Sequence, residues 1–300
     1  MALVLAACGA PGPDGSPPRD LNTGTYLVLL GTGTPNADPD RWGPALAVLV
    51  DGTAYLVDAG PGVVRRAAGA AANGADGLRA ERLATVFITH LHHDHTLGLA
   101  DLIFSPWTLG REEPLRVYGP PGTAAMVDHL QAAYAEDVRI RLDGLEPANR
   151  TGHEATVHDI ADTGEVYADA RVRVTAFPVH HGSWPHAFGY RFESPERTIV
   201  VSGDATKSET VVTYCNSCDV LVHEVYSEAG FATRPPEWQA YHARFHTSSV
   251  DLADLATRAR PALLVLYHQL LWGQPEAVLM SEIKSRYDGP VVFGRDLEVY

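Results

Sequence analysis

Five short apolar segments of this chain lead into a side chain that can bind a cation, and this repetition constrains the fold more than any other feature. The residues that follow the segments are His90, His181, Asp204, His223 and His268. The segments are rich in β-branched and aliphatic residues, as buried strands are. Because aligned strands bring their ends to one edge of a sheet, we expect these distant residues to meet. The pattern therefore predicts an α/β fold with a site assembled at a sheet edge.

The densest group of such side chains is His90, His92, Asp94 and His95. Residues 84–89 before it read as a buried strand, and an apolar, helix-like run follows it through residue 104. His90 and His92 lie two positions apart, so on extended chain they point the same way. Asp94 and His95 come after the turn and can face a second point. This arrangement suits two metal ions better than one; imidazole and carboxylate ligands favour zinc, with iron or manganese as alternatives.

The composition is that of a globular protein with an acidic surface. The chain has 300 residues, 45% of them hydrophobic, and a formal net charge of −14. This charge argues against a broad nucleic-acid surface, which needs clustered lysine and arginine. No apolar run approaches the roughly 20 residues of a membrane-spanning helix. Without an internal repeat or a second boundary, residues 23–300 are predicted to form one domain.

The N-terminal segment, residues 1–22, is expected to stay outside the fold. Residues 5–8 read LAAC, like a bacterial lipobox in which Cys8 carries a lipid anchor. Residues 9–20 are rich in proline and glycine and read as a flexible tether. However, the apolar run is short and no lysine or arginine precedes it. Two interpretations stay open: a periplasmic or cell-envelope lipoprotein, and a cytoplasmic protein with an apolar start.

Other segments have clearer local signals. Strands are predicted at residues 26–30, 171–179, 198–202, 220–222 and 263–266, a hairpin at 45–57 through Asp51-Gly52, helices at 63–72, 123–136 and 247–260, and a peripheral excursion with short strands at 137–170. Cys215 and Cys218 lack the second pair that a four-cysteine zinc site needs. They are interpreted as structural or incidental, and in an oxidising compartment the two would form a local disulfide.

The motifs together resemble the metallo-β-lactamase superfamily. His90-x-His92-x-Asp94-His95, His181, Gly203-Asp204 and His268 occur in the order of that family, and the match runs from about residue 26 to the C-terminus. The resemblance implies an αβ/βα four-layer sandwich, in which two mixed sheets pack face to face with helices outside.

The resemblance also implies a ligand set, in which one residue would be shared. His90, His92 and His181 would bind the first zinc ion, and Asp94, His95 and His268 the second, with Asp204 bridging both. His181 is favoured over its neighbour His180, because the downstream AFGYRF stretch at 187–192 places the ligand there.

Within the superfamily, the chain resembles tRNase Z and its arylsulfatase-like relatives most. The stretches that carry this resemblance are LGTGTP at 30–35, HEVY at 223–226 and HTSS at 246–249. By this resemblance, His246 is the general acid, Glu224 is its partner, and Asp94 helps to orient the nucleophile while remaining a ligand. Asp58 would hydrogen-bond a metal ligand.

The substrate class is less constrained than the metal site. Two cations lower the pKa of a shared water from near 16 towards roughly 7, so that hydroxide attacks an ester. The tRNA-cleaving relatives carry a long arm between the positions of His181 and Asp204, where this chain has only a short segment. We therefore expect a dinuclear zinc hydrolase acting on a small phosphodiester or aryl sulfate, without nucleic acid as partner and with homodimers as in relatives.

Three alternatives stay open. The chain could instead be a tRNA 3′-end endonuclease, a lactone or β-lactam hydrolase that does not need His246, or a metal-binding module without catalysis. Five aromatic residues either wall a substrate pocket or pack in the ordinary way: Trp107, Trp184, Phe231, Trp238 and Trp272.

Overall fold

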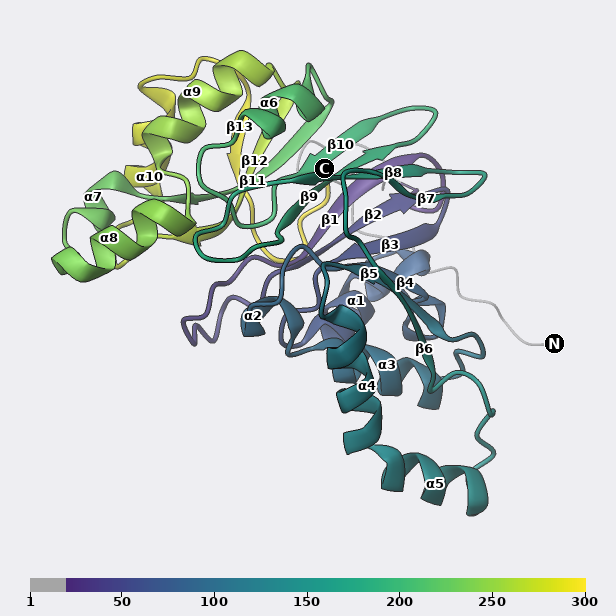
Figure 1. Cartoon of the computed structure of the whole chain (residues 1–300). Coiled ribbons are helices and arrows are strands. Elements are labelled where there is room, and N and C mark those ends of the chain that lie inside the picture. Colours follow the sequence, from purple (N-terminus) through teal and green to yellow (C-terminus); the bar gives the residue numbers. More distant parts are fainter. Residues whose placement is uncertain (1–19) are drawn as a thin grey trace.

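The computed structural model describes residues 20–300 (Figure 1). Cys8 and the tether lie outside the described residues, so the lipobox interpretation stays a prediction. Among the described residues that were expected to stay outside the fold, Leu21 is buried against the core. No helix among residues 20–300 is long and apolar enough to cross a membrane.

The first sheet contains six strands in chain order. They are β1 (Thr25–Gly31), β2 (Ala45–Val50), β3 (Thr53–Val57), β4 (Thr85–Phe87), β5 (Leu115–Gly119) and β6 (Ala155–Asp159). The first three pair antiparallel and the last three join in parallel. Asp51 and Gly52 connect β2 to β3 with positive φ angles of 45° and 70°, so the predicted hairpin turn is confirmed.

The second sheet contains seven strands in the order β13-β12-β11-β10-β9-β8-β7. They are β7 (Gly164–Ala168), β8 (Arg173–Pro178), β9 (Phe188–Glu193), β10 (Thr198–Val201), β11 (Val220–Tyr226), β12 (Leu263–Leu270) and β13 (Val291–Phe293). Strands β10 to β13 are parallel, and β7 to β10 are antiparallel. This sheet is mixed as well.

Alternating side chains of the strands pack on opposite faces of each sheet. Leu27 and Leu29 of β1 belong to a hydrophobic cluster shared by the two sheets, whereas Val28 and Leu30 face the helices. All four side chains are fully buried, which matches the two-residue period of a strand covered on both sides. The sheets therefore pack face to face with helices outside, and the predicted four-layer αβ/βα sandwich is confirmed (Figure 1).

Helices cover the outer face of each sheet. On the first sheet they are α1 (Val63–Ala72), α3 (Leu99–Thr108) and α4 (Thr123–Ala133), and on the second α6 (Glu209–Cys215), α9 (Ser249–Ala259) and α10 (Glu276–Lys284). The start of α9 is capped as predicted, because the Ser248 hydroxyl accepts a hydrogen bond from the Asp251 amide at 3.0 Å.

One predicted helix was drawn too long. The segment 123–136 contains all of α4 and the first residues of a second helix, α5 (Ala135–Asp143), most of which lies in the region where only short strands were expected. Helix α5 has no buried residue and projects from the body with α4 (Figure 1). With so little apolar surface to bury, its sequence carries no periodic signal that would separate it from a loop.

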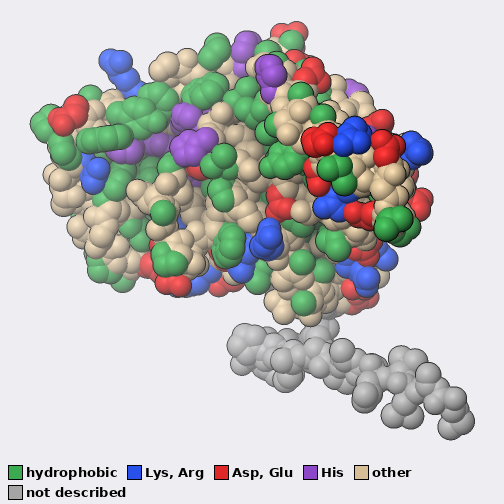
Figure 2. Space-filling model, turned by 90° about the horizontal axis from the view of Figure 1, so that it is seen from below, with side chains coloured by type: hydrophobic (Ala, Val, Ile, Leu, Met, Phe, Trp, Pro, Cys, Tyr) green, Lys and Arg blue, Asp and Glu red, His purple; other side chains and the backbone are tan. Residues whose placement is uncertain are grey.

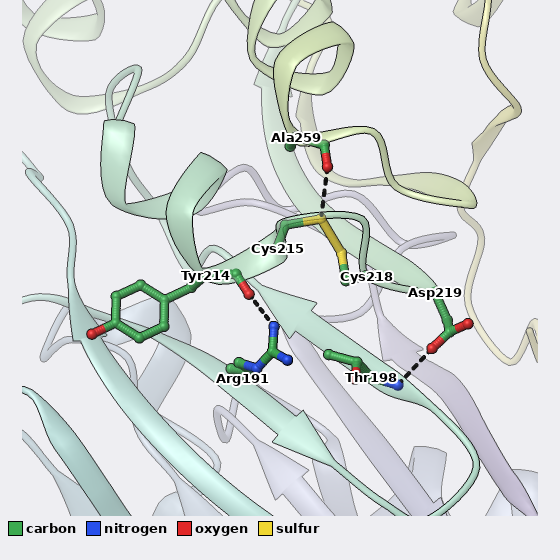
Figure 3. The surroundings of a disulfide bond; sticks show 7 residues. All are labelled: Arg191, Thr198, Tyr214, Cys215, Cys218, Asp219 and Ala259. Atoms are coloured by element: carbon green, nitrogen blue, oxygen red, sulfur yellow. Dashed lines mark hydrogen bonds between the residues drawn. A yellow bond between two sulfur atoms is a disulfide. The ribbon is translucent and has the colours of Figure 1, made fainter.

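The two cysteines are joined in a disulfide that closes the turn between α6 and β11 (Figure 3). Nearby, Arg191 of β9 donates to the carbonyl oxygen of Tyr214, and the Thr198 amide donates to Asp219 at 2.7 Å. Both sulfur-bearing residues are buried in the cluster between the second sheet and its helices. The structural interpretation of Cys215 and Cys218 is thus the one that the fold supports.

Candidate metal centre

The predicted ligands come from both sheets and meet at one end of the sandwich. His90, His92 and the short helix α2 (His93–Thr96) follow β4, while the others follow or lie within strands of the second sheet. Figure 2 shows histidine side chains on one face of the molecule, among hydrophobic side chains. Gly203 permits the approach of the sheets, because its φ is +62° and a Cβ there would lie 2.9 Å from the Cβ of Thr89.

The first group of side chains has three imidazoles facing one another. The Nε2 atom of His90 lies 2.9 Å from Nδ1 of His92, and Nε2 of His181 lies 3.1 Å from the same atom. A carboxylate oxygen of Asp204 belongs to this group, with all ligand atoms within 4.8 Å of one another. Of the adjacent pair, His181 is fully buried in the group, whereas His180 is exposed. The structure thus places His181, not His180, where the resemblance required a ligand.

The second group combines carboxylates with imidazoles. Asp94 Oδ2 lies 3.6 Å from His95 Nε2 and 3.3 Å from His268 Nε2. The same two imidazole nitrogens lie 3.4 Å and 3.6 Å from Asp204 Oδ2. Asp204 therefore stands between the two groups, as the resemblance implied for a bridging ligand.

The donor atoms fit cations. Nε2 of His95 and Oδ1 of Asp204 are buried, and neither has a hydrogen-bond partner among residues 20–300. Such atoms are costly to bury unless something satisfies them. Imidazole nitrogen and carboxylate oxygen are ligands of zinc and of related transition metals. The clusters therefore form a metal site.

Electrostatics differ between the two groups. Burial lowers the pKa of His90, of His92 and of His181, the last to about 3, which keeps these rings neutral with free lone pairs. Burial also opposes charge on His95, but the carboxylates around it outweigh burial and raise its pKa. The second group thus carries excess negative charge that favours a cation.

Asp58 fixes the orientation of a predicted ligand. His95 Nδ1 donates to Asp58 Oδ2 at 2.8 Å, which turns Nε2 towards the centre. The Thr89 amide and hydroxyl donate to the same carboxylate at 2.8 and 3.0 Å. The expected hydrogen bond from Asp58 to a ligand is present. Asp58 itself has a positive φ of 61°, a strained conformation that the surrounding bonds hold in place.

His268 occupies a bulge inside a strand. Glu224 pairs with Tyr267 and Val225 with Gln269, so His268 is the extra residue of β12, and its φ is +45°. From the sequence, β11 was expected to end at residue 222 and β12 at residue 266. The structure corrects this, since both strands continue past the site to Tyr226 and Leu270. A bulge re-aims a side chain without ending the ladder.

His246 and Glu224 lie together beside Asp204. His246 ends the helix α8 (Pro236–Phe245), and its Nδ1 is 3.4 Å from Glu224 Oε2 and 3.9 Å from Asp204 Oδ2. Glu224 Oε1 accepts hydrogen bonds from the amides of Thr247 and Ala205 at 2.8 and 3.3 Å. Burial raises the pKa of Glu224, and burial lowers that of His246 to about 4. This pair is therefore held in its uncharged form, with one proton to share.

The aromatic residues named from the sequence separate into two sets. Trp107 is buried in the core of the first half and donates to the Asn149 carbonyl, so it does not line the centre. Trp184 donates to Nε2 of His92 at 2.8 Å and lies at the edge of the first group. Phe231, Trp238 and Trp272 belong to a cluster around α8, which is described below.

Sequence reasoning missed two features near the centre. A cavity of about 330 Å³ lies beside Asp94, lined by the loop 34–43 and by His93 and Leu97 of the α2 region. Helix α8 was not predicted, and it brings Tyr241 and His242 close to His246. The spacing of Trp238, Tyr241, His242 and Phe245 along a helical face was the signal that would have revealed it.

A family model, described as the beta-lactamase superfamily domain, matches residues 53–269. The chain belongs to the metallo-β-lactamase superfamily. The matched segment contains every candidate ligand and both members of the His246–Glu224 pair. As a member of this superfamily, the protein is a metal-dependent hydrolase that acts on ester bonds.

Several proteins of known name or structure are similar to this superfamily member. "Ribonuclease Z" of Mycobacterium sp. (strain KMS) is 32% identical over 277 residues, which cover 91% of this chain and 92% of the relative. The crystal structure of the short form of human tRNase Z has a TM-score of 0.69 at 21% identity, covering 92% of this chain and 98% of that one. The metallo-β-lactamase fold protein YhfI from Bacillus subtilis has a TM-score of 0.66 at 17% identity, covering 92% of this chain and 98% of its own.

The alignment also bears on the long arm that was expected in tRNA-cleaving relatives between the positions of His181 and Asp204. The 277 aligned positions take in 91% of the 300 residues here, so the mycobacterial relative has no long insertion between the aligned ends. A short segment between His181 and Asp204 therefore does not distinguish this superfamily member from a relative named ribonuclease Z. The acidic net charge is the remaining argument against a nucleic-acid substrate.

Proposed function

We propose that this protein is a phosphodiesterase of the ribonuclease Z kind, which cleaves RNA, with the 3′ extension of a precursor tRNA as the first substrate to test. One observation carries the proposal: the buried pair of His246 and Glu224 stands beside Asp204 at the metal centre. A ribose oxygen is a poor leaving group and needs a proton, whereas an aryl oxygen leaves without one. The relatives at about 32% identity support this choice over the small-ester hydrolase that the sequence favoured.

The proposed cofactor is a pair of zinc ions. His90, His92, His181 and Asp204 would hold one ion, and Asp94, His95 and His268 the other, with Asp204 reaching both because it also lies close to His95 and His268. When bound, such ions supply Lewis acidity, which neutralises charge on phosphoryl oxygens and makes water a nucleophile at neutral pH. Asp94 would accept a hydrogen bond from the nucleophile and so orient it, while remaining a metal ligand.

Proton transfer to the leaving oxygen follows from the contacts of His246. Its Nδ1 faces the carboxyl of Glu224, which leaves Nε2 for the substrate. Since the pKa of Glu224 is raised and that of His246 is lowered, we place one proton on Glu224 Oε2 and one on His246 Nε2. As Nε2 gives its proton to the departing oxygen, Nδ1 takes one from Glu224. The negative charge then lies on the Glu224 carboxylate, to which the amides of Ala205 and Thr247 donate hydrogen bonds.

A second candidate, hydrolysis of a small phosphodiester or aryl sulfate, is favoured by two observations. The chain has a formal net charge of −14, and the cavity beside Asp94 is about 330 Å³, the size of a small ligand. A long polyanion would be repelled by the surface unless contacts at the centre outweigh this.

The two candidates separate in one set of assays. The zinc-loaded full chain is given a precursor tRNA with a 3′ extension, bis(p-nitrophenyl) phosphate and p-nitrophenyl sulfate. We expect kcat/KM for the precursor tRNA to exceed that for either small ester, with a single cut at the 3′ extension. Faster turnover of a small ester contradicts the ribonuclease proposal and selects the second candidate.

A further inference from the structure

One face of α8 is entirely aromatic. Trp238, Tyr241, His242 and Phe245 occupy positions i, i+3, i+4 and i+7 of this helix, so they share one side. We call these four residues the α8 aromatic face. Because the helix ends directly at His246, this face leads to the residue that is proposed to protonate the leaving group.

Ring contacts run along the α8 aromatic face to the metal ligands. Trp238 stacks on His242, with ring centroids 5.7 Å apart, and Tyr241 stacks on Phe245 at 4.2 Å. Phe245 in turn lies 5.1 Å from the ring of His181. A continuous row of rings therefore extends from the surface to the first ligand group.

A second row of rings lies against the first. Trp272 lies 4.6 Å from His242, and Tyr226 and Phe231 pack beside it. The guanidinium of Arg234 lies 5.8 Å over the ring of Trp272 and adds a positive charge to this wall.

The α8 aromatic face is only partly buried. His242 is the one buried residue of α8, whereas Trp238 is 46% exposed. Tyr241 is part-exposed and stacks on Phe245, which in turn contacts the ring of His181. Figure 2 shows hydrophobic side chains gathered around histidines at the surface. Exposed aromatic surface beside a reactive centre indicates a ligand surface.

We propose that the α8 aromatic face and Trp272 form a stacking subsite for a flat aromatic ring on the leaving side of the substrate. The proposal rests on the proposed function, because the side is assigned from the role of His246. The ring is a nucleobase in an RNA substrate or an aryl group in a small ester. Stacking on aromatic side chains contributes about 1–3 kcal/mol per base and tolerates any base, since every base has a π face.

Binding tests the subsite without requiring turnover. Calorimetry compares adenosine 3′-monophosphate with ribose 3-phosphate on the zinc-loaded full chain, since the two probes differ in the base and both carry the phosphate on the 3′-oxygen, the leaving oxygen when a 3′ extension is removed. We expect the nucleotide to bind about 5- to 150-fold more tightly, the range that corresponds to the stacking energy of one base. Trp238→Ala should remove most of this preference, and Trp238→Phe should restore part of it. Tyr134→Ala, which alters an aromatic residue of similar exposure (43%) far along the chain at the α4–α5 junction, should leave it unchanged.

The outcomes separate this inference from the ribonuclease proposal. Equal binding of the two probes, or an equal loss for both in Trp238→Ala, overturns the subsite. A retained preference without any RNA cleavage contradicts the ribonuclease proposal alone. In that case, a phosphodiester with a phenyl leaving group should be cleaved faster than one with an alkyl group of similar size, and Trp238→Ala should reduce only the former.

Discussion

The candidate ligands from the first sheet and those from the second sheet are positioned in different ways. His90, His92, Asp94 and His95 come from one loop and one short helix, behind a single strand of the first sheet. His181, Asp204 and His268 come from separate strands or strand ends of the second sheet. The first set is local in sequence, whereas the second depends on the correct register of several strands.

The comparison shows where the rigidity of the centre comes from. Asp58 and Thr89 hold the local set through hydrogen bonds within the first sheet. The dispersed set is held by the sheet itself, with His268 in a bulge and Asp204 behind a glycine that permits close approach. The centre therefore joins two sheets, and Asp204 of the dispersed set lies against ligands of both groups.

Replacement of the shared residue should have the largest effect. Asp204→Asn keeps the size of the side chain but removes the charge that faces both ligand groups. We expect activity on the preferred ester to fall by more than ~10²-fold, beyond the loss typical of residues that only orient ligands, together with lost metal by elemental analysis. Asp219→Asn, at a carboxylate that binds a strand amide elsewhere, is the matched control. Full metal content in Asp204→Asn would contradict the bridging role.

Removal of the proton donor should have the next largest effect, and the size should depend on the leaving group. His246→Ala should reduce kcat for an alkoxide leaving group by ~10²–10⁴-fold, the usual contribution of a general acid. The same variant should retain most activity on p-nitrophenyl esters and its metal content. Equal losses on both substrates would show that His246 supports the structure of the centre instead.

Loss of the support beneath the local set should have a smaller effect. Asp58→Ala frees the ring of His95 to turn, because its Nδ1 no longer has an acceptor. We expect about 10–100-fold weaker metal affinity, measured by competition with a chelator. Thr89→Val, which removes one of the hydrogen bonds to Asp58, should lower affinity less. An unchanged affinity in Asp58→Ala would mean that the local set needs no support from the Asp58 carboxylate.

The pH dependence of the chelated protein should show the smallest difference, which lies between the group around His90, to which His181 belongs, and the group around Asp94, to which His268 belongs. The folded-state pKa of His181 is lowered to about 3, so between its unfolded value and that point the unfolded chain binds more protons. Its contribution to stability is therefore lost as pH falls below about 6.5. The pKa of His268 is raised, because the charge of Asp204 and the hydrogen bond to Asp94 outweigh burial, so its contribution is present at low pH and lost as pH rises.

Urea unfolding in EDTA at pH 7.0, 6.0 and 5.0 measures this difference. His181→Gln should flatten the decline towards acid by at most about 1.4 kcal/mol per pH unit. His268→Gln should steepen the same decline. Identical slopes in the two variants would contradict the electrostatic difference between the group around His90 and the group around Asp94.

Much of the fold and centre could be predicted from the sequence, for physical reasons that differ by element. The local set stands out because its ligands lie within a few positions, and the resemblance of the motifs to the metallo-β-lactamase superfamily implied the sandwich. The ends of β11 and β12 were placed too early, because a polar residue inside a buried strand reads as a strand end unless a bulge is foreseen. Helix α8 was missed although its aromatic residues recur at helical spacing, because only His242 of the helix is buried and its contact with Trp272 is long-range in sequence.

The bulge at His268 has a consequence for how such proteins diverge. Deleting that one residue would let β11 and β12 pair without interruption, so the sheet would gain regularity while the second ligand group lost a member. A single-codon deletion would thus yield a well-folded chain without a complete centre. Inactive descendants of this architecture should accordingly be recognised by one missing residue in the penultimate strand rather than by an eroded core.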